Sequence, residues 1–289
     1  MKSLKLSGFS DEISPDIQVQ FKTLNKLGIQ YYEPRGVNGK NISELTHAEV
    51  ADLCKTMKEF GIKSSSVGSP IGKFKLSGDF EKHFELFKKV IETALLLESR
   101  YVRIFSFFRE GDAWNEKMHD TIFENLRRMI DYAKLNGVIL LHENEKDIYG
   151  DTAGRCLELM KELSCENFKA VFDPANFIQC GEDTIKAYEK LKDYIAYVHI
   201  KDAVLCDGRV VPAGYGDGNI EYILEQLICG GYDGFLSLEP HLGNFQGLDE
   251  LELSDIMKGL PESGEGTFTL AFNALEKILN KLSGGKYNG

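Results

Sequence analysis

Eight short apolar segments divide this chain, and each is followed by a longer stretch with helical periodicity. The apolar segments cover residues 4–10, 30–33, 62–67, 101–107, 138–143, 169–173, 195–201 and 234–239. They are apolar on both faces, as strands are when helices cover both sides of a parallel sheet. Alternating strands and helices indicate such a sheet, and eight units are the number that closes a (β/α)₈ barrel. The sequence therefore predicts an α/β protein with the TIM-barrel fold.

The helical stretches show regular periodicity and stop signals. In the first, Ile17, Phe21 and Leu24 recur at spacings of three and four residues, and Gly28 follows as a terminator. The other helices are predicted at residues 46–60, 79–98, 115–136, 151–163, 183–192, 220–229 and 267–282. Because no linker interrupts the pattern, we expect a single domain over residues 1–289. The rival fold is an open doubly wound sheet, but no G-x-G-x-x-G motif follows the first strand to support it.

The composition narrows the range of partners. The 289 residues carry a formal net charge of −11 without a Lys/Arg cluster, which argues against a nucleic-acid partner. No apolar run reaches the roughly 18 residues of a membrane span, so no membrane partner is expected. The opening segment MKSLKLSGFS contains no apolar signal, and the six cysteines form no C-x-x-C pair. We therefore expect a cytoplasmic protein with reduced thiols.

Four ionisable residues occupy the ends of the last four predicted strands. Glu143, Asp173 and Glu239 close their strands, and His199 lies near the end of the seventh. In a (β/α)₈ barrel these ends form the catalytic face. A buried carboxylate there is unfavourable unless it is paired, hydrogen-bonded or bound to a metal. A lone Glu at a strand end is usually solvated and a lone His is usually a core residue, but four together favour one shared site.

Three carboxylates and one imidazole form a suitable ligand set for a divalent cation. Oxygen donors suit Mg²⁺ and Mn²⁺, and the imidazole also admits Zn²⁺, Co²⁺ or Fe²⁺. Three negative charges repel one another without a cation between them, whereas three such charges and one dication sum to −1. We therefore predict one divalent metal ion, with Mn²⁺ as the first expectation, held by Glu143, Asp173, His199 and Glu239.

Several short motifs carry a resemblance to a known family. They are DEISPD at 11–16, HEN at 142–144, FDPAN at 172–176, VHIKDA at 198–203, GYGDGNI at 214–220 and GYDGFLSLEP at 231–240. Together they make the whole chain resemble the xylose isomerase-like barrels. That family includes tagatose and psicose 3-epimerases, inosose dehydratase and the family 2 apurinic endonucleases.

The resemblance implies specific roles for the four strand-end residues. It implies that all four are metal ligands and that Glu143 and Glu239 also act as the acid and base of an epimerase. One carboxylate would remove a proton next to a carbonyl and the other would return it on the opposite face, while the metal stabilises the cis-enediolate. The resemblance further implies a homo-oligomer, either a dimer or a tetramer.

The chain departs from the family pattern at one ligand-like position. Asn176 stands where many of these epimerases have a histidine, so it is expected to hydrogen-bond the substrate rather than to bind metal. The apurinic endonucleases need further His and Asp ligands for a trinuclear zinc cluster. Residues 202–217 contain no histidine that could serve in this way. These departures disfavour a nuclease.

Other polar and aromatic residues are candidate substrate contacts near the same barrel face. Asp202 either orients a ligand or substrate hydroxyl or belongs to a solvated loop. Arg103, inside the fourth strand, either pairs with a carboxylate or binds a substrate anion, and Trp114 either caps the pocket or anchors a helix. The full set is Asn176, Lys201, Asp202, Arg103, Trp114 and His241.

The sequence thus favours a divalent-metal-dependent isomerase or epimerase of a small keto-sugar or related polyol. An inosose-type dehydratase that uses the same metal site is the alternative. An apurinic endonuclease-like hydrolase and a non-catalytic sugar-binding protein are less favoured. The acidic, glycine-rich loop at residues 243–266 is expected to be a lid, a contact surface or a disordered segment.

Overall fold

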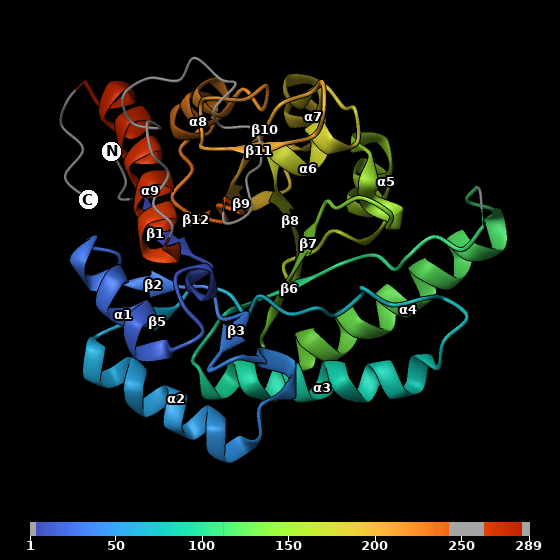
Figure 1. Ribbon diagram of the computed structural model, residues 1–289. Coiled ribbons are helices and arrows are strands. Elements are labelled where there is room, and N and C mark those ends of the chain that lie inside the picture. The colour runs from blue at the N-terminus through green and yellow to red at the C-terminus, as the bar shows by residue number, and fades with distance from the viewer. Residues whose placement is uncertain (1–3, 112, 243–262, 285–289) are drawn as a thin grey trace.

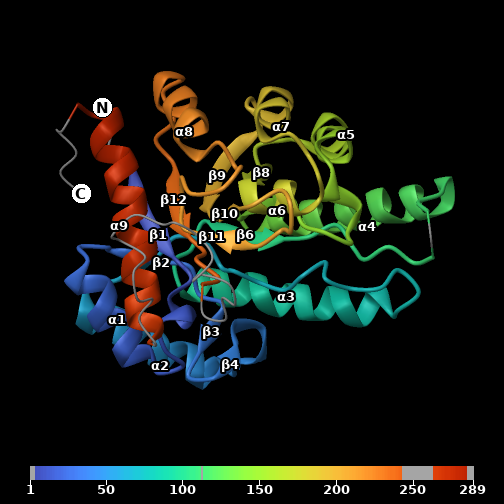
Figure 2. The same cartoon turned by 45° about the horizontal axis from the view of Figure 1, so that its top comes forward.

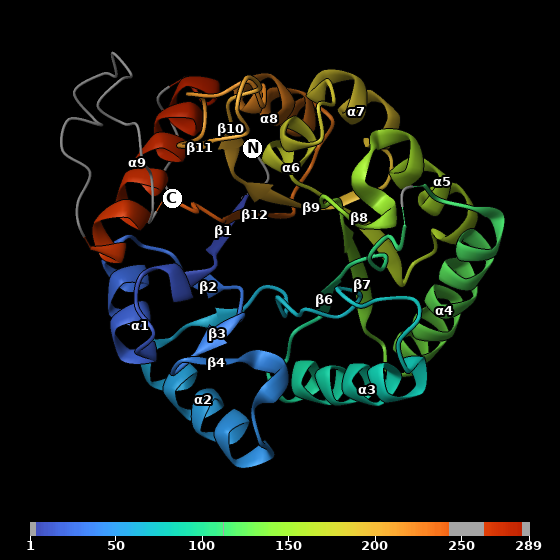
Figure 3. The same ribbon diagram turned by 45° about the vertical axis from the view of Figure 1, so that its right-hand side comes forward.

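The computed structural model describes residues 4–111, 113–242 and 263–284, in which parallel strands curl around a common axis inside a ring of helices (Figure 1, Figure 3). Six strands form one hydrogen-bonded sheet in the order β1-β12-β9-β8-β7-β6, and every pairing is parallel. Their bounds are β1 Lys5–Gly8, β6 Tyr101–Ile104, β7 Ile139–Glu143, β8 Phe168–Phe172, β9 Ile195–Ile200 and β12 Phe235–Leu238.

Two short strands complete the ring as a separate parallel pair. They are β2 (Tyr31–Tyr32) and β5 (Lys63–Ser64). The Glu33 amide donates to the Gly8 carbonyl at 2.9 Å, which joins this pair to β1, and Val67 forms a parallel bridge to β6. All eight predicted strands are present, and the predicted (β/α)₈ TIM barrel is confirmed.

The predicted helices lie outside the strands. They are α1 Ile17–Lys26, α2 His47–Phe60, α3 Phe80–Leu96, α4 Glu116–Leu135, α5 Ala153–Leu163, α7 Thr184–Leu191, α8 Ile220–Cys229 and α9 Gly264–Leu282. The side chains of Thr46, Asp79 and Asn115 cap α2, α3 and α4 by accepting hydrogen bonds from first-turn amides. Gly61 ends α2 with a φ of 68°, which favours glycine. These local signals explain why the predicted bounds agree closely with the structure.

The last helix returns to the start of the chain. Figure 2 shows α9 running beside β1. The fit is close, because a Cβ atom added at Gly8 would lie 2.6 Å from Cζ of Phe268. The last strand, β12, also pairs with β1, so the last strand and the last helix of the described chain both contact the first strand.

The alternation of side chains along the strands separates two layers of the core. Outward residues such as Leu140, Phe172 and Leu236 pack beneath the helices. Inward residues form a separate buried cluster, made of Ile139, Leu141, Val171, Tyr197 and Phe235. The inward rows continue to the C-terminal ends of the strands, and this continuation positions the candidate site.

Several short elements were absent from the sequence prediction. They include the helix α6 (Pro174–Gln179) and two hairpins, β3 with β4 (Gly36–Val37, Lys40–Asn41) and β10 with β11 (Asp202–Ala203, Val210–Val211). They are too short for hydrophobic periodicity to reveal. The predicted loop 243–266 lies, except for its last four residues, outside the described residues. None of the helices in the described part of the chain is both long and apolar enough to cross a membrane.

Candidate metal centre

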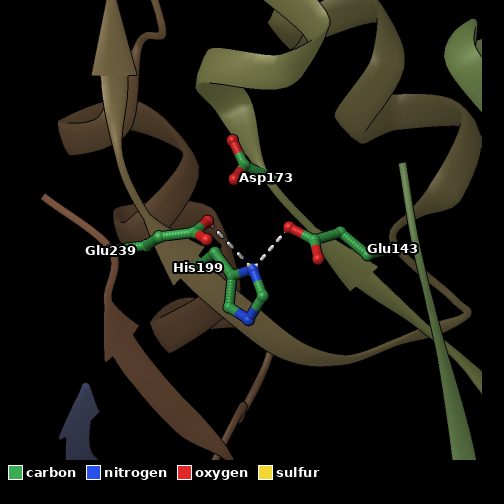
Figure 4. A group of neighbouring side chains, drawn as sticks. All are labelled: Glu143, Asp173, His199 and Glu239. Atoms are coloured by element: carbon green, nitrogen blue, oxygen red, sulfur yellow. Dashed lines mark hydrogen bonds and ion pairs between the residues drawn. The ribbon is translucent and has the colours of Figure 1, made fainter. Parts of the chain in front are cut away.

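The four strand-end residues meet at one point inside the barrel mouth (Figure 4). Glu143 continues the inward row of β7, two residues after Leu141, and His199 follows Tyr197 in the same way on β9. Asp173 and Glu239 come directly after β8 and β12. All four are at most 3% exposed. The two-residue repeat of a strand therefore brings four polar side chains to the place where the apolar inward rows end.

The spacing of the donor atoms is close to that of a ligand shell. Nδ1 of His199 lies 2.7 Å from Oε1 of Glu143 and 3.7 Å from Oε2 of Glu239. One donor atom from each of the four residues lies within 4.8 Å of all the others. Donors bound to one ion at about 2.1 Å are separated by roughly 3.0 to 4.2 Å in tetrahedral or octahedral geometry. The four residues therefore fit a divalent ion after small side-chain adjustments.

Asp173 has one carboxylate oxygen directed to structure and one left over. Oδ1 caps the short helix α6 by accepting the Asn176 amide at 2.9 Å. Oδ2 accepts no hydrogen bond within the described part of the chain, although the Lys201 ammonium lies 2.9 Å away. Burial raises the pKa of Asp173 to about 7, because the attraction of Lys201 offsets only part of the burial effect. An oxygen that binds a metal ion is expected to be buried without a hydrogen bond while the ion is absent, and Oδ2 of Asp173 meets this expectation.

Three side-chain cations also surround the carboxylates. The Arg103 guanidinium lies 3.1 Å from Glu143, and the Arg35 guanidinium lies 3.1 Å from Glu239. The Lys201 ammonium is 2.9 Å from Glu239 as well as from Asp173. The argument that these carboxylates need a dication to balance their charge is therefore wrong, because the chain supplies positive charge itself. The donor geometry, and not charge alone, supports a metal.

Nearby positive charges keep Glu143 and Glu239, the two candidate acid/base groups, ionised. Burial acts to raise the pKa of Glu143, but the charges of His199 and Arg103 outweigh it and lower that pKa to about 2. For Glu239, burial is likewise outweighed, first by Lys201, and the pKa lies well below its usual range. Both carboxylates are therefore available as ligands or bases at neutral pH.

Asn144 and Asn176 tie the strand ends together. The Asn144 amide group donates to the Asp173 carbonyl at 2.9 Å, and its oxygen accepts the Asp173 amide at 3.0 Å. Asn176 donates to the Asn144 carbonyl at 2.9 Å and lies 3.5 Å from Oε1 of Glu143. No role was predicted for Asn144 from the sequence, although the HEN motif contains it. A polar residue next to a strand-end carboxylate is the signal that could have found it.

Asp202 points into its own loop instead of toward the four strand-end residues. Its fully buried carboxylate accepts the amides of Ala203, Gly214, Gly216 and Gly218 at 2.8 to 3.0 Å. A Cβ atom on Gly218 would lie 2.6 Å from Oδ1 of Asp202, so the loop closes around the carboxylate only with glycine. Neither of the two roles considered for Asp202, orienting a ligand or sitting in a solvated loop, describes this anchoring.

Three other candidate substrate contacts, Arg103, Trp114 and Lys201, each have different neighbours in the structure. Besides Glu143, Arg103 donates to the carbonyls of Gly68 and Ser69, which is the structural pairing considered as one alternative. Trp114 packs edge-on against Tyr149, with ring centroids 5.2 Å apart. Lys201 lies within the cluster, as described above.

His241 lies at the outer edge of the site. Its Nε2 is 3.4 Å from Oε1 of Glu239 and 3.4 Å from Oε1 of Glu12, and its side chain is 42% exposed. Glu12 and Asp11 also bind Arg35. Burial raises the pKa of Glu12 to about 7 despite the Arg35 charge. Neither acid was proposed from the sequence, although both come soon after the first strand, at the same barrel face.

Several known proteins are similar to this chain in sequence or in fold. The 3-dehydroshikimate dehydratase of Bacillus anthracis is 22% identical over 132 residues, which are 46% of this chain and 47% of that protein. The chain thus spans about half the length of this relative. A D-tagatose 3-epimerase-like protein superposes with a TM-score of 0.73 at 18% identity, over 97% of this chain and 99% of that one. The IOLI protein with a bound zinc atom superposes with a TM-score of 0.74 at 20% identity, over 96% of this chain and 99% of that one.

The fold and the site together define a (β/α)₈ barrel with a buried cluster of three carboxylates and one histidine at the C-terminal ends of its strands. A sequence profile of the family described as xylose isomerase-like TIM barrel matches residues 21–258, which is more than half of the chain. The chain belongs to this family.

Proposed function

We propose that this protein is a divalent-metal-dependent isomerase or epimerase of a small keto-sugar or related polyol. The observation that carries the proposal is the buried set Glu143, Asp173, His199 and Glu239, whose donor atoms lie within 4.8 Å of one another. These four residues would hold the ion. We propose Mn²⁺ as the resident ion because three of the four ligands are hard carboxylates, with Mg²⁺, Co²⁺, Zn²⁺ and Fe²⁺ as alternatives.

A bound divalent ion would polarise the substrate carbonyl and stabilise the enediolate formed from it. The chain supplies the proton transfers. Glu143, whose ionised form is favoured by the Arg103 guanidinium 3.1 Å away, accepts the proton from the carbon next to the carbonyl. Glu239 lies on the other side of His199 and serves as the second carboxylate (Figure 4). The ammonium of Lys201 donates to Oε2 of Glu239 at 2.9 Å and holds this carboxylate in place; Glu239 takes up a proton from solvent and returns it to the opposite face of the substrate carbon, and Glu143 releases the proton it accepted to solvent.

A dehydratase is the second candidate, and the position of Lys201 favours it. A lyase must protonate a departing hydroxide, and an ammonium group directly beside Asp173 and Glu239 is a proton donor inside the site. The similarity to 3-dehydroshikimate dehydratase supports the same idea. Both reactions begin with removal of a proton next to a carbonyl, so the residues of the first step are shared.

The test is a screen of ketoses and inososes with the metal-supplemented protein in D₂O. Deuterium incorporation at a sugar carbon without loss of water supports the epimerase or isomerase, whereas a dehydrated product supports the lyase. Glu143→Gln should abolish incorporation, because an amide cannot accept the proton. If no member of the screen exchanges or loses water while the protein binds its ion, the catalytic proposal is wrong and a sugar-binding role replaces it.

We also propose that the protein acts in the cytoplasm as a homo-oligomer on small molecules. Its charge of −11 and the absence of a Lys/Arg cluster in the sequence support a small-molecule substrate over a nucleic acid. Cleavage of DNA that contains abasic sites would overturn this part of the proposal.

A further inference from the structure

We propose that Glu33 is a positioning residue that fixes the tautomer of His199 and thereby directs Nδ1 to the metal centre. The inference rests on the metal centre of the proposed function and deepens it. Glu33 directly follows β2 and is 1% exposed. Its Oε2 lies 3.3 Å from Nε2 of His199. It is thus a buried carboxylate on the side of the imidazole that faces away from the proposed ligands.

The chemistry of imidazole gives this contact its meaning. Figure 4 shows one ring nitrogen of His199 facing Glu143 and Glu239, with the other pointing away from them. A nitrogen that gives its lone pair to a metal ion carries no proton, so the proton of the neutral ring lies on the other nitrogen, Nε2. A carboxylate beside Nε2 stabilises that tautomer and fixes the plane of the ring.

Other polar groups hold Glu33 in place. Its Oε2 accepts hydrogen bonds from the Tyr197 hydroxyl at 2.9 Å and from the Ser237 hydroxyl at 2.8 Å. Ser65 contacts the same Tyr197 hydroxyl at 2.8 Å. All of these side chains are buried. Both hydroxyls that donate to Glu33 bind the same oxygen, Oε2, and no hydrogen bond holds Oε1 within the described structure.

Two unsatisfied atoms point to the missing interaction. Within the described residues, Oε1 of Glu33 and Nε2 of His199 are buried and form no directed hydrogen bond. The contact between Nε2 and Oε2 is close, but its direction is not that of a hydrogen bond. Such bonds are often poorly aligned in ligand-free sites and tighten when the ligand binds. A rotation of the carboxylate would give the Nε2 proton its acceptor and satisfy both atoms at once.

The first experiment measures metal affinity by competition with a chromophoric chelator, using Zn²⁺ and Mn²⁺. We expect Glu33→Gln to weaken binding roughly 10- to 100-fold, the usual effect of removing a carboxylate that orients a ligating histidine. Glu12→Gln is the matched control. Glu12 is a partly buried carboxylate near the site that contacts Arg35 and His241, and no hydrogen bond or ion pair joins it to His199 in the described structure, so Glu12→Gln makes the same substitution without removing a partner of the imidazole. Its effect on affinity should be clearly smaller.

The second experiment reads the tautomer directly. In the Zn²⁺-loaded protein with ¹⁵N-labelled histidine, the ring nitrogen signals of His199 should show a protonated Nε2, and in Glu33→Gln this signal should broaden or shift. The inference is overturned if Glu33→Gln and Glu12→Gln bind zinc equally well and the His199 signals stay the same. If the unmodified protein binds no ion, the metal centre itself fails, and the inference fails with it.

A milder variant covers the case in which Glu33→Gln does not fold. Ser237→Ala keeps the carboxylate but removes one of the two hydroxyls that hold its Oε2. We expect it to fold and to weaken zinc binding more than Glu12→Gln does. Unchanged zinc affinity in Ser237→Ala, together with an unchanged His199 signal, would mean that Glu33 only satisfies neighbouring hydroxyls.

Discussion

Replacing Asp202 with alanine tests the structural role that the coordinates give to this residue. The substitution removes the acceptor of four backbone amides, those of Ala203, Gly214, Gly216 and Gly218. The bonds to Ala203 and Gly218 are buried, whereas the other two are partly buried and can be replaced by water. A buried donor left unsatisfied costs about 1–3 kcal/mol. The two buried amides alone therefore predict a loss of about 2–6 kcal/mol in the free energy of unfolding.

The assay is urea unfolding followed by circular dichroism, with and without bound ion. Asp217→Asn is the matched control, because Asp217 accepts a single exposed amide, that of Leu205, at 2.7 Å. We expect that control to change stability by less than about 1 kcal/mol. A loss below about 1 kcal/mol for Asp202→Ala, with a large loss of substrate affinity instead, would refute the anchoring role and restore the substrate-binding one.

Three further predictions follow from single contacts. Gly218→Ala should destabilise the protein in the same urea assay, because its Cβ would lie 2.6 Å from Oδ1 of Asp202; an unchanged midpoint would contradict the close packing. The free energy of unfolding should fall as the pH drops from 6.5 toward 4, because burial lowers the pKa of His83 to about 4 and the unfolded chain takes up the proton first. In a pH series of urea unfolding midpoints, His83→Leu should flatten this fall. An identical slope in the variant and the unmodified protein would contradict the role of His83. Lys201→Met should raise the pH at which half of the bound ion is released, because Lys201 is the strongest attraction that lowers the pKa of Glu239 and a carboxylate with a higher pKa gives up its ion to a proton at higher pH. A metal-release titration with no shift would exclude that coupling.

The fold could be predicted because its signals are local. Apolar runs mark the strands, and capping residues such as Thr46 and Asn115 mark the helix starts. The four strand-end residues could be found for the same reason, since a charged residue that closes an apolar run is visible in the sequence and the barrel rule places it at one face. The short helix α6 (Pro174–Gln179) was missed because one and a half turns show no periodicity.

A carboxylate partner for Arg103 was one of the alternatives predicted from the sequence, but which carboxylate each cation contacts could not be predicted, because that depends on side-chain direction across distant segments. Arg35 reaches Glu239 across 204 positions of sequence, and Arg103 reaches Glu143 across 40. Without these contacts, the charge of the carboxylates seemed to require a dication. Asp202 closely follows the strand that carries His199, yet its carboxylate turns back to a glycine loop that only the folded chain brings near.

The central claim is that Glu143, Asp173, His199 and Glu239 bind one divalent ion, and anomalous X-ray scattering from crystals soaked in Mn²⁺ tests it most directly. We predict one strong peak within about 2.0–2.3 Å of a donor atom from each of the four residues. A map with no peak at this position, or with manganese bound by fewer than three of the four side chains, would contradict the claim.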